Sequence, residues 1–77
     1  MNKLVTINLT GDQALVLFEW ITRFNNRETP ETFEDQSEER VLWDIEAMLE
    51  KALAEPFDRD YDRLLALARA NVRDPTG

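Results

Sequence analysis

The residues best suited to chemistry form an acidic triplet, Asp58, Asp60 and Asp62. Carboxylates at alternate residues occupy the first three ligand positions of an EF-hand-type loop, where their oxygens wrap Ca²⁺. Such a loop then needs a glycine for its turn and a glutamate as its last ligand. Arg63 and Arg69 stand at those two positions. Cations there oppose Ca²⁺ binding, so we interpret the triplet as helix-start acids and expect no metal site.

A second acidic group, Glu38 and Glu39, resembles the start of the E-E-x-x-E cluster that holds magnesium in all-helical nucleotide pyrophosphohydrolases of the MazG type. The resemblance implies a third glutamate, but that position is Leu42, on the apolar face of the same segment. Acids in the first turn of a helix have an ordinary electrostatic explanation. We therefore expect no magnesium chemistry here.

Nucleophilic catalysis lacks its usual residues. The chain contains no Cys and no His, and Ser37 has no lysine nearby in the sequence to activate it. The only glycines are Gly11 and Gly77, so no glycine-rich phosphate-binding loop is present. Sixteen acids in 77 residues make accidental carboxylate pairs inevitable. We expect no catalytic residue and no cofactor, and we predict that the protein is not an enzyme.

The acidic charge is concentrated in the middle of the chain. The net charge is -7, and residues 31–58 carry ten acids but only two bases, Arg40 and Lys51. This field opposes binding to nucleic acid and anionic membranes and suits a basic protein partner. The longest apolar run, residues 14–18, is far below the roughly 20 residues of a membrane span. With no apolar leader near the N-terminus, a cytoplasmic location is expected.

The small size of the chain makes self-association attractive. A domain of 77 residues buries only about 60–65% of its unfolded surface, so its stability is marginal. Small domains usually gain stability from disulfides, metals or oligomerisation. Without Cys and His, oligomerisation is the route left open.

The periodicity predicts a mainly α fold: a three-helix domain, preceded by a short N-terminal β-strand at about residues 4–9. Helices are expected at about 11–25, 36–54 and 58–73, with a frayed tail at 74–77, in a single domain over 1–77. Thr10 and Gln13 match a capping box at the start of the first helix. Asp35 with Glu38, or Ser37 alone, can cap the second helix.

The first helix has an unusually wide apolar face. Its apolar residues cover an arc of roughly 200°, so neighbours are expected on two sides. They are Ala14, Val16, Leu17, Phe18, Trp20, Ile21 and Phe24. The second helix has a regular stripe, expected to face the core, that comprises Val41, Leu42, Ile45, Met48, Leu49, Ala52 and Leu53. Trp43 lies off that stripe and needs another neighbour.

The N-terminal strand has no evident partner within the sequence. Its backbone groups must pair with a second copy, with another protein, or with solvent. We therefore predict a homo-oligomer, with a dimer favoured. Its candidate interface comprises Val5, Ile7, Leu9, Val16, Trp20 and Trp43.

Two other functions compete with the structural oligomer. One is a module that offers its strand edge or its Trp43 face to a different protein. The other is an acidic inhibitor, such as an immunity protein, an antitoxin or a DNA mimic, that occupies a basic site on its partner. The candidate acidic partner surface comprises Glu39, Glu46 and Glu50, which no i,i+4 base neutralises.

Three segments carry a family resemblance: T-G-D-Q-A-L-V-L-F-E-W, F-E-D-Q-S-E-E-R-V-L-W-D-I-E-A-M-L-E-K and A-E-P-F-D-R-D-Y. Together they resemble small uncharacterised bacterial acidic helical proteins. The resemblance implies a bacterial cytoplasmic protein and carries no activity, cofactor or site residue.

Overall fold

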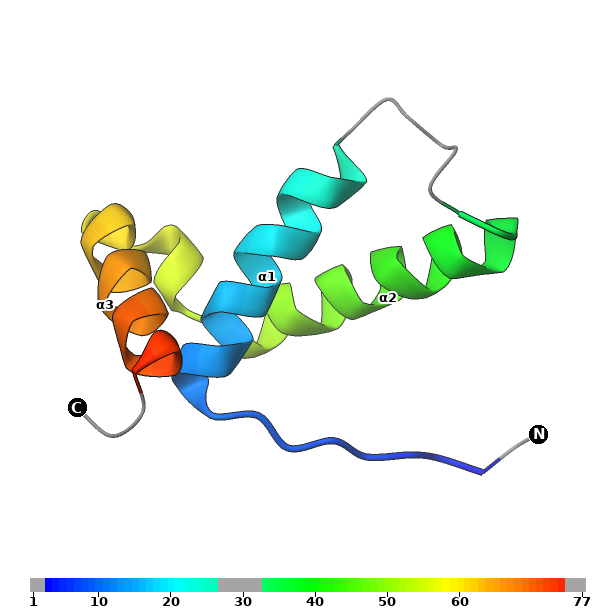
Figure 1. Ribbon diagram of the computed structural model, residues 1–77, viewed down its shortest axis with the longest axis horizontal. Helices are drawn as coiled ribbons and strands as arrows, with labels where there is room; N and C mark the ends of the chain where they lie inside the picture. Colours follow the sequence, from blue (N-terminus) through cyan, green and yellow to red (C-terminus); the bar gives the residue numbers. More distant parts are fainter. Residues whose placement is uncertain (1–2, 27–32, 75–77) are drawn as a thin grey trace.

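A computed structural model describes residues 3–26 and 33–74 of the chain. They form three α-helices, α1 (Gly11–Asn25), α2 (Gln36–Ala52) and α3 (Tyr61–Arg73), with a short 3₁₀ helix, η2 (Glu55–Phe57), before α3. Figure 1 shows α1 in the middle, with α3 on one side and α2 crossing it on the other. The mainly helical, three-helix prediction is confirmed, and α1 has neighbours on two sides.

Local hydrogen bonds cap the N-termini of α1 and α2. Thr10 Oγ1 accepts the Gln13 backbone N–H at 3.0 Å, and Gln13 Oε1 accepts the Thr10 N–H at 2.9 Å. This is the predicted capping box. Asp35 is the N-cap of α2, and its Oδ2 accepts the Ser37 N–H at 2.8 Å. Glu38 instead accepts the N–H of Glu34.

The core lies mainly between α1 and α3. Its buried centre contains Leu15, Leu65 and Ala68. Half-buried apolar residues from all three helical regions surround them, namely Val16, Leu53, Tyr61 and Leu64. Ile21, on α1, is only 1% exposed. The core is small, because only six apolar residues are buried in the part of the chain that the structure describes.

The expectation that the stripe of α2 faces the core is wrong for part of it. No residue of α2 is buried, and Val41 and Met48 are 52% and 61% exposed. The helix packs mainly against α1, which leaves Leu42, Ile45 and Leu49 half-buried. One neighbour covers less than the width of such a stripe. The remainder faces outward.

Two predicted helix ends differ from those observed. The second helix ends at Ala52, and Leu53 is extended and packs against the core. The third begins at Tyr61, three residues later than expected. The cause is a turn in which Asp58 Oδ1 accepts the Asp60 N–H at 2.8 Å. Such Asx turns compete with helical geometry.

The N-terminal segment, residues 3–10, is neither helix nor strand in this single chain. All its residues are exposed, and it runs away from the start of α1 (Figure 1). A strand exists only when another strand pairs with it, and no described part of the chain does so. The pairing across a dimer therefore stays a prediction. The predicted fraying of residues 75–77 lies outside the described residues.

Candidate interaction surface

A groove between α1 and α3 brings together three of the six predicted interface residues: Leu9, Val16 and Trp20. We call it the Trp20 groove. Its lining is Leu9, Gln13, Val16, Leu17, Trp20, Arg23, Arg69 and Val72. Trp20 stays 44% exposed although it lies on the central helix. The side of α1 that carries Val16 and Trp20, two of the predicted interface residues, is therefore an open apolar groove.

A second groove lies between α1 and the beginning of α2, and we call it the Phe33 groove. It is lined by Trp20, Phe24, Phe33, Ser37, Glu38, Val41 and Leu42. The Trp20 and Phe24 rings stack at 5.0 Å, and the Phe33 ring meets Phe24 edge-on at 5.6 Å. Because Trp20 lines both grooves, the two form one apolar surface across α1.

The other predicted interface residues lie elsewhere. Val5 and Ile7 are 81% and 77% exposed on the N-terminal segment. Trp43 is half-exposed and lines a separate hollow at the start of α2, beside Glu39 and Arg40. The structure therefore does not bring Trp43 together with Trp20.

Sequence reasoning missed several residues of this surface. Val41 was expected to face the core with its stripe, and Val72 was not among the predicted interface residues, yet both line a groove and remain 52% and 39% exposed. Helical periodicity identifies an apolar face but carries no signal for whether a neighbour covers it. Leu4 points to the other side of the predicted strand from Val5, and it is 91% exposed.

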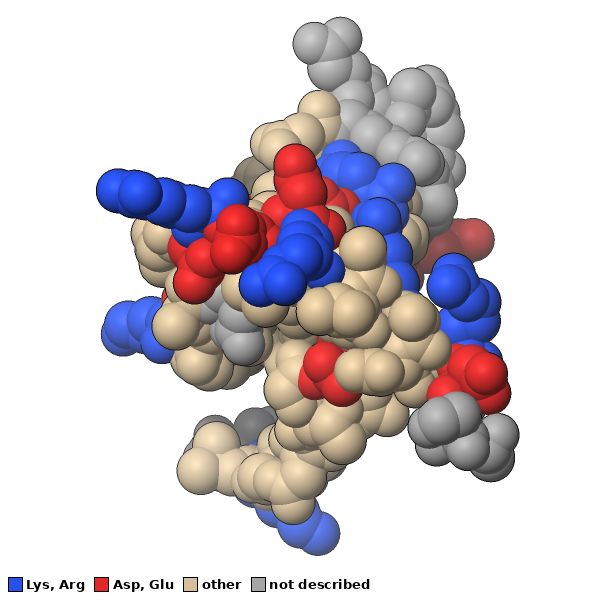
Figure 2. Space-filling model, turned by 90° about the vertical axis from the view of Figure 1, so that its left-hand side faces the viewer, with Lys and Arg blue, Asp and Glu red and all other residues tan. Residues whose placement is uncertain are grey.

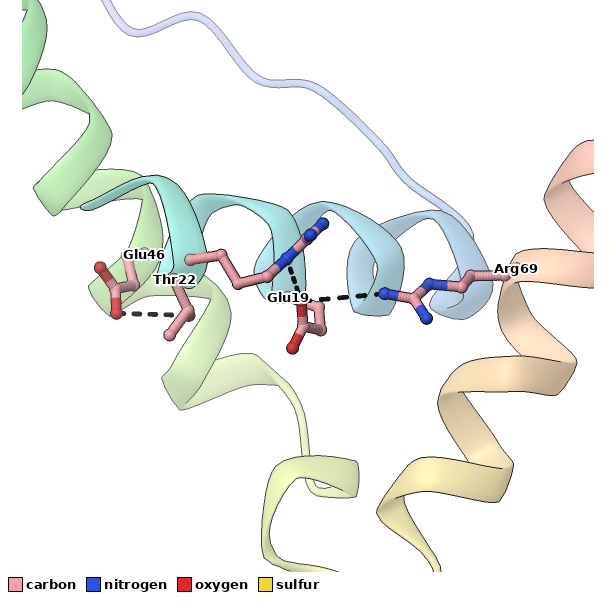
Figure 3. Close-up of polar contacts among 5 residues, drawn as sticks. Glu19, Thr22, Glu46 and Arg69 are labelled. Carbon is pink, nitrogen blue, oxygen red and sulfur yellow. Dashed lines mark hydrogen bonds and ion pairs between the residues drawn. The ribbon is translucent and has the colours of Figure 1, made fainter. Parts of the chain in front are cut away.

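The three residues of the candidate acidic partner surface, Glu39, Glu46 and Glu50, have two different roles in the structure. Glu46 Oε1 accepts a hydrogen bond from Asn25 Nδ2 at 2.6 Å, and Oε2 accepts one from the Thr22 hydroxyl at 3.3 Å. Figure 3 shows Glu46 pointing at Thr22 across the α1–α2 contact. Glu50 is exposed and Glu39 is half-buried. Glu46 therefore joins α2 to α1, which leaves Glu39 and Glu50 as the more available acids.

A second polar contact joins α1 to α3. Glu19 Oε2 lies 2.7 Å from Arg23 Nε on the same helix and 3.9 Å from an Arg69 nitrogen on α3 (Figure 3). Burial raises the pKa of the nearby Tyr61 phenol above its usual value, and the negative charge of Glu19 raises it further. At the start of α2, hydrogen bonds from the Ser37 side chain and backbone lower the pKa of Asp35.

Figure 2 shows the face of the molecule that carries α3. There, basic and acidic side chains lie beside one another, with other residues exposed between them (Figure 2). Among residues 3–26 and 33–74, no group of three or more potential ligands is arranged to hold a metal ion. None of the described helices is long and apolar enough to cross a membrane.

Comparison with protein-family models, with curated proteins and with solved structures gives no match. The predicted resemblance to small bacterial acidic helical proteins therefore stays a prediction.

Proposed function

We propose that this protein is a non-enzymatic interaction module that acts in the bacterial cytoplasm and self-associates as a dimer. The observation that carries this proposal is the large accessible surface area of the chain. Its accessible surface is 6675 Å² for a mass of 9.0 kDa. A compact monomer of that mass exposes about 4,900 Å². The excess is about 1,800 Å², whereas a standard interface buries about 800 Å² on each partner.

The radius of gyration supports the same interpretation. It is 14.1 Å over Cα atoms, against about 11.5 Å for a compact domain of this length. The extended N-terminal segment and the divergent α2 both contribute to the larger value (Figure 1). Both also carry exposed apolar side chains, including Ile7 and Met48. A second chain that covered them would supply the apolar burial that the small core lacks.

The exposed backbone of the N-terminal segment is available to pair with another strand. The segment alternates apolar and polar residues as a β-strand does, and it exposes Leu4, Val5 and Ile7. Both features are typical of a segment that forms a strand by pairing with the edge of another strand. A second copy offers an identical edge, and twofold symmetry lets each segment satisfy the other. We therefore include pairing of residues 4–9 across the dimer in the proposal.

The alternative function, an acidic inhibitor of a basic protein, has less support. Of its three predicted residues, Glu46 is engaged with Asn25 and Thr22. Electrostatic recognition of a basic site needs several uncommitted carboxylates on one surface. Glu39 and Glu50 remain, which is a smaller surface than the sequence suggested.

Sedimentation equilibrium on matched variants tests the proposed surface. Ile7→Asp and Trp20→Asp place a charge in the exposed apolar surface and should each weaken dimerisation at least tenfold. Leu67→Asp is the control, since Leu67 is 52% exposed on α3 and lines neither groove. Circular dichroism on each variant monitors folding. Equal weakening by all three would contradict the assignment of the surface, and so would no weakening by the first two.

A further inference from the structure

We infer that the Trp20 groove binds the N-terminal segment of a second copy. The Val5 side chain of that copy then lies beside Leu9 of the first. The inference rests on the proposed self-association and specifies how the two chains meet. The two segments form an antiparallel ribbon centred on Ile7. The apolar face of the ribbon then covers the grooves of both copies.

Leu9 provides the starting point for this geometry. It is 42% exposed and lines the Trp20 groove with Val16 and Val72, whereas Val5 and Ile7 of the same chain are 81% and 77% exposed. Leu9 therefore lies in the groove of its own chain, whereas Val5 and Ile7, earlier in the segment, lie outside it. The remainder of the groove stays open beside Leu9.

The alternation of the segment restricts the register. Side chains directly opposite one another in an antiparallel pair point to the same face of the ribbon. Placing Ile7 opposite Ile7 of the other copy sets each Val5 opposite a Leu9. All six of these aliphatic side chains then share one face, and Thr6 lies opposite Asn8 on the other. A shift of one residue would place aliphatic side chains opposite polar ones and divide the apolar face.

This register carries the second copy's segment to the groove. Directly opposite residues have Cα atoms about 4.5–5.5 Å apart, so Val5 of the second copy lies immediately beside Leu9. The groove has a volume of about 400 Å³, and a water molecule occupies about 30 Å³ of liquid. There is room for the three side-chain carbons of a valine against Trp20.

The ribbon also accounts for the backbone of the segment. Within the described chain, residues 3–9 form no backbone hydrogen bond. Pairing satisfies inward-facing N–H and C=O groups that an apolar cover would otherwise leave buried without partners. A two-stranded ribbon is marginal alone. Packing against α1 and α3 of both copies supplies the apolar support that it needs.

Disulfide trapping tests the register, because the chain has no cysteine of its own. Opposed Cα atoms at that spacing fall within the range of about 4.4–6.8 Å that a disulfide spans. The Ile7→Cys protein should form a covalent dimer on mild oxidation. Thr6→Cys and Asn8→Cys should crosslink poorly alone, since identical residues are then diagonal neighbours about 7–8 Å apart. Mixed together, they should crosslink readily. Leu67→Cys is the control for random collision.

The result separates this inference from the proposed function. A chain that sediments as a dimer but gives no more Ile7→Cys crosslink than Leu67→Cys would overturn the ribbon and leave self-association intact. A chain that stays monomeric at all concentrations would overturn both. A crosslink with Thr6→Cys alone that equals the mixture would overturn the register.

Tryptophan fluorescence tests whether the second copy's segment binds in the Trp20 groove. Trp43→Phe leaves Trp20 as the only tryptophan, since the chain has two. Concentrating this variant should shift the Trp20 emission to shorter wavelength as the second copy's Val5 covers the ring. Adding Val5→Asp should abolish the shift. An emission that is the same in the monomer and the dimer would show that the segment seats elsewhere.

Discussion

Asn25 Nδ2 donates a 2.6 Å hydrogen bond to Glu46 Oε1 across the contact between α1 and α2. The same carboxylate accepts the Thr22 hydroxyl at 3.3 Å. These bonds join α1 to α2, a helix that has no buried residue.

Loss of the Glu46 carboxylate should therefore destabilise the fold. We expect Glu46→Ala to lower the free energy of unfolding by about 1–3 kcal/mol, because it removes a charged acceptor and leaves the Asn25 amide without it. Glu50→Ala, on the same helix but exposed, is the matched control and should change stability by about 0.5 kcal/mol or less. Urea denaturation at fixed protein concentration measures both values. Equal effects would contradict the structural role of Glu46.

The buried position of Ile21 makes a second prediction. Ile21→Ala should cost about 2–5 kcal/mol, because Ile21 is 1% exposed and its truncation leaves a cavity. Leu67→Ala, at 52% exposure, should cost less than about 1 kcal/mol. Thermal unfolding of both variants at one concentration makes the comparison. A smaller loss for Ile21→Ala than for Leu67→Ala would show that the core lies elsewhere.

The capping box at Thr10 gives a third prediction. Thr10→Ala should destabilise by about 0.5–2 kcal/mol because the Gln13 N–H loses its acceptor. Thr10→Ser keeps the hydroxyl and should restore most of the loss. Helicity by circular dichroism and urea unfolding would report both. If serine fails to restore stability, the hydroxyl is not what matters at this position.

The pKa of Tyr61 gives a prediction for alkaline pH. Burial, and then the charge of Glu19, raise its pKa above the ordinary value of 10.0. Because the folded pKa is the higher one, stability is unaffected by Tyr61 below about pH 10 and falls as pH rises through the folded pKa. Tyr61 is the only tyrosine, so an ultraviolet absorbance titration observes it directly.

Glu19→Gln provides the control for that titration. It removes the negative charge beside the phenol and should reduce the rise in pKa, while the part due to burial remains. Titration in urea should return the ordinary value. A folded-state pKa at or below that of the unfolded chain would contradict the half-buried placement of Tyr61 near Glu19.

Features encoded locally were predictable from the sequence. The Thr10–Gln13 box is set within a few residues and appears in the structure. The apolar arc of α1 appears in part: its Ala14, Phe18 and Ile21 are buried, but so is Leu15, which the arc left out. The burial of α2 was not predictable in the same way, because Val41 belongs to a regular stripe whether or not a neighbour covers it. Glu46 reads as a surface acid because its partners, Thr22 and Asn25, are 24 and 21 residues away.

The early start predicted for the third helix has a similar cause. Acids near a helix start favour helix in general, but Asp58 uses its carboxylate to accept the Asp60 N–H and holds the chain in a turn. The uncovered side of α1 was predictable in outline from the width of its apolar arc. The groove at Trp20 adds Val72 and Arg69, which only the packing of α3 brings there.

The most direct test of the central claim is the molar mass of the unmodified chain, measured by light scattering across a dilution series. The chain has a mass of 9.0 kDa, so a self-associating module should have twice that mass at micromolar concentration and approach the single-chain mass on dilution. Ile7→Asp should shift the transition to higher concentration. A mass of one chain at every concentration would contradict the proposal.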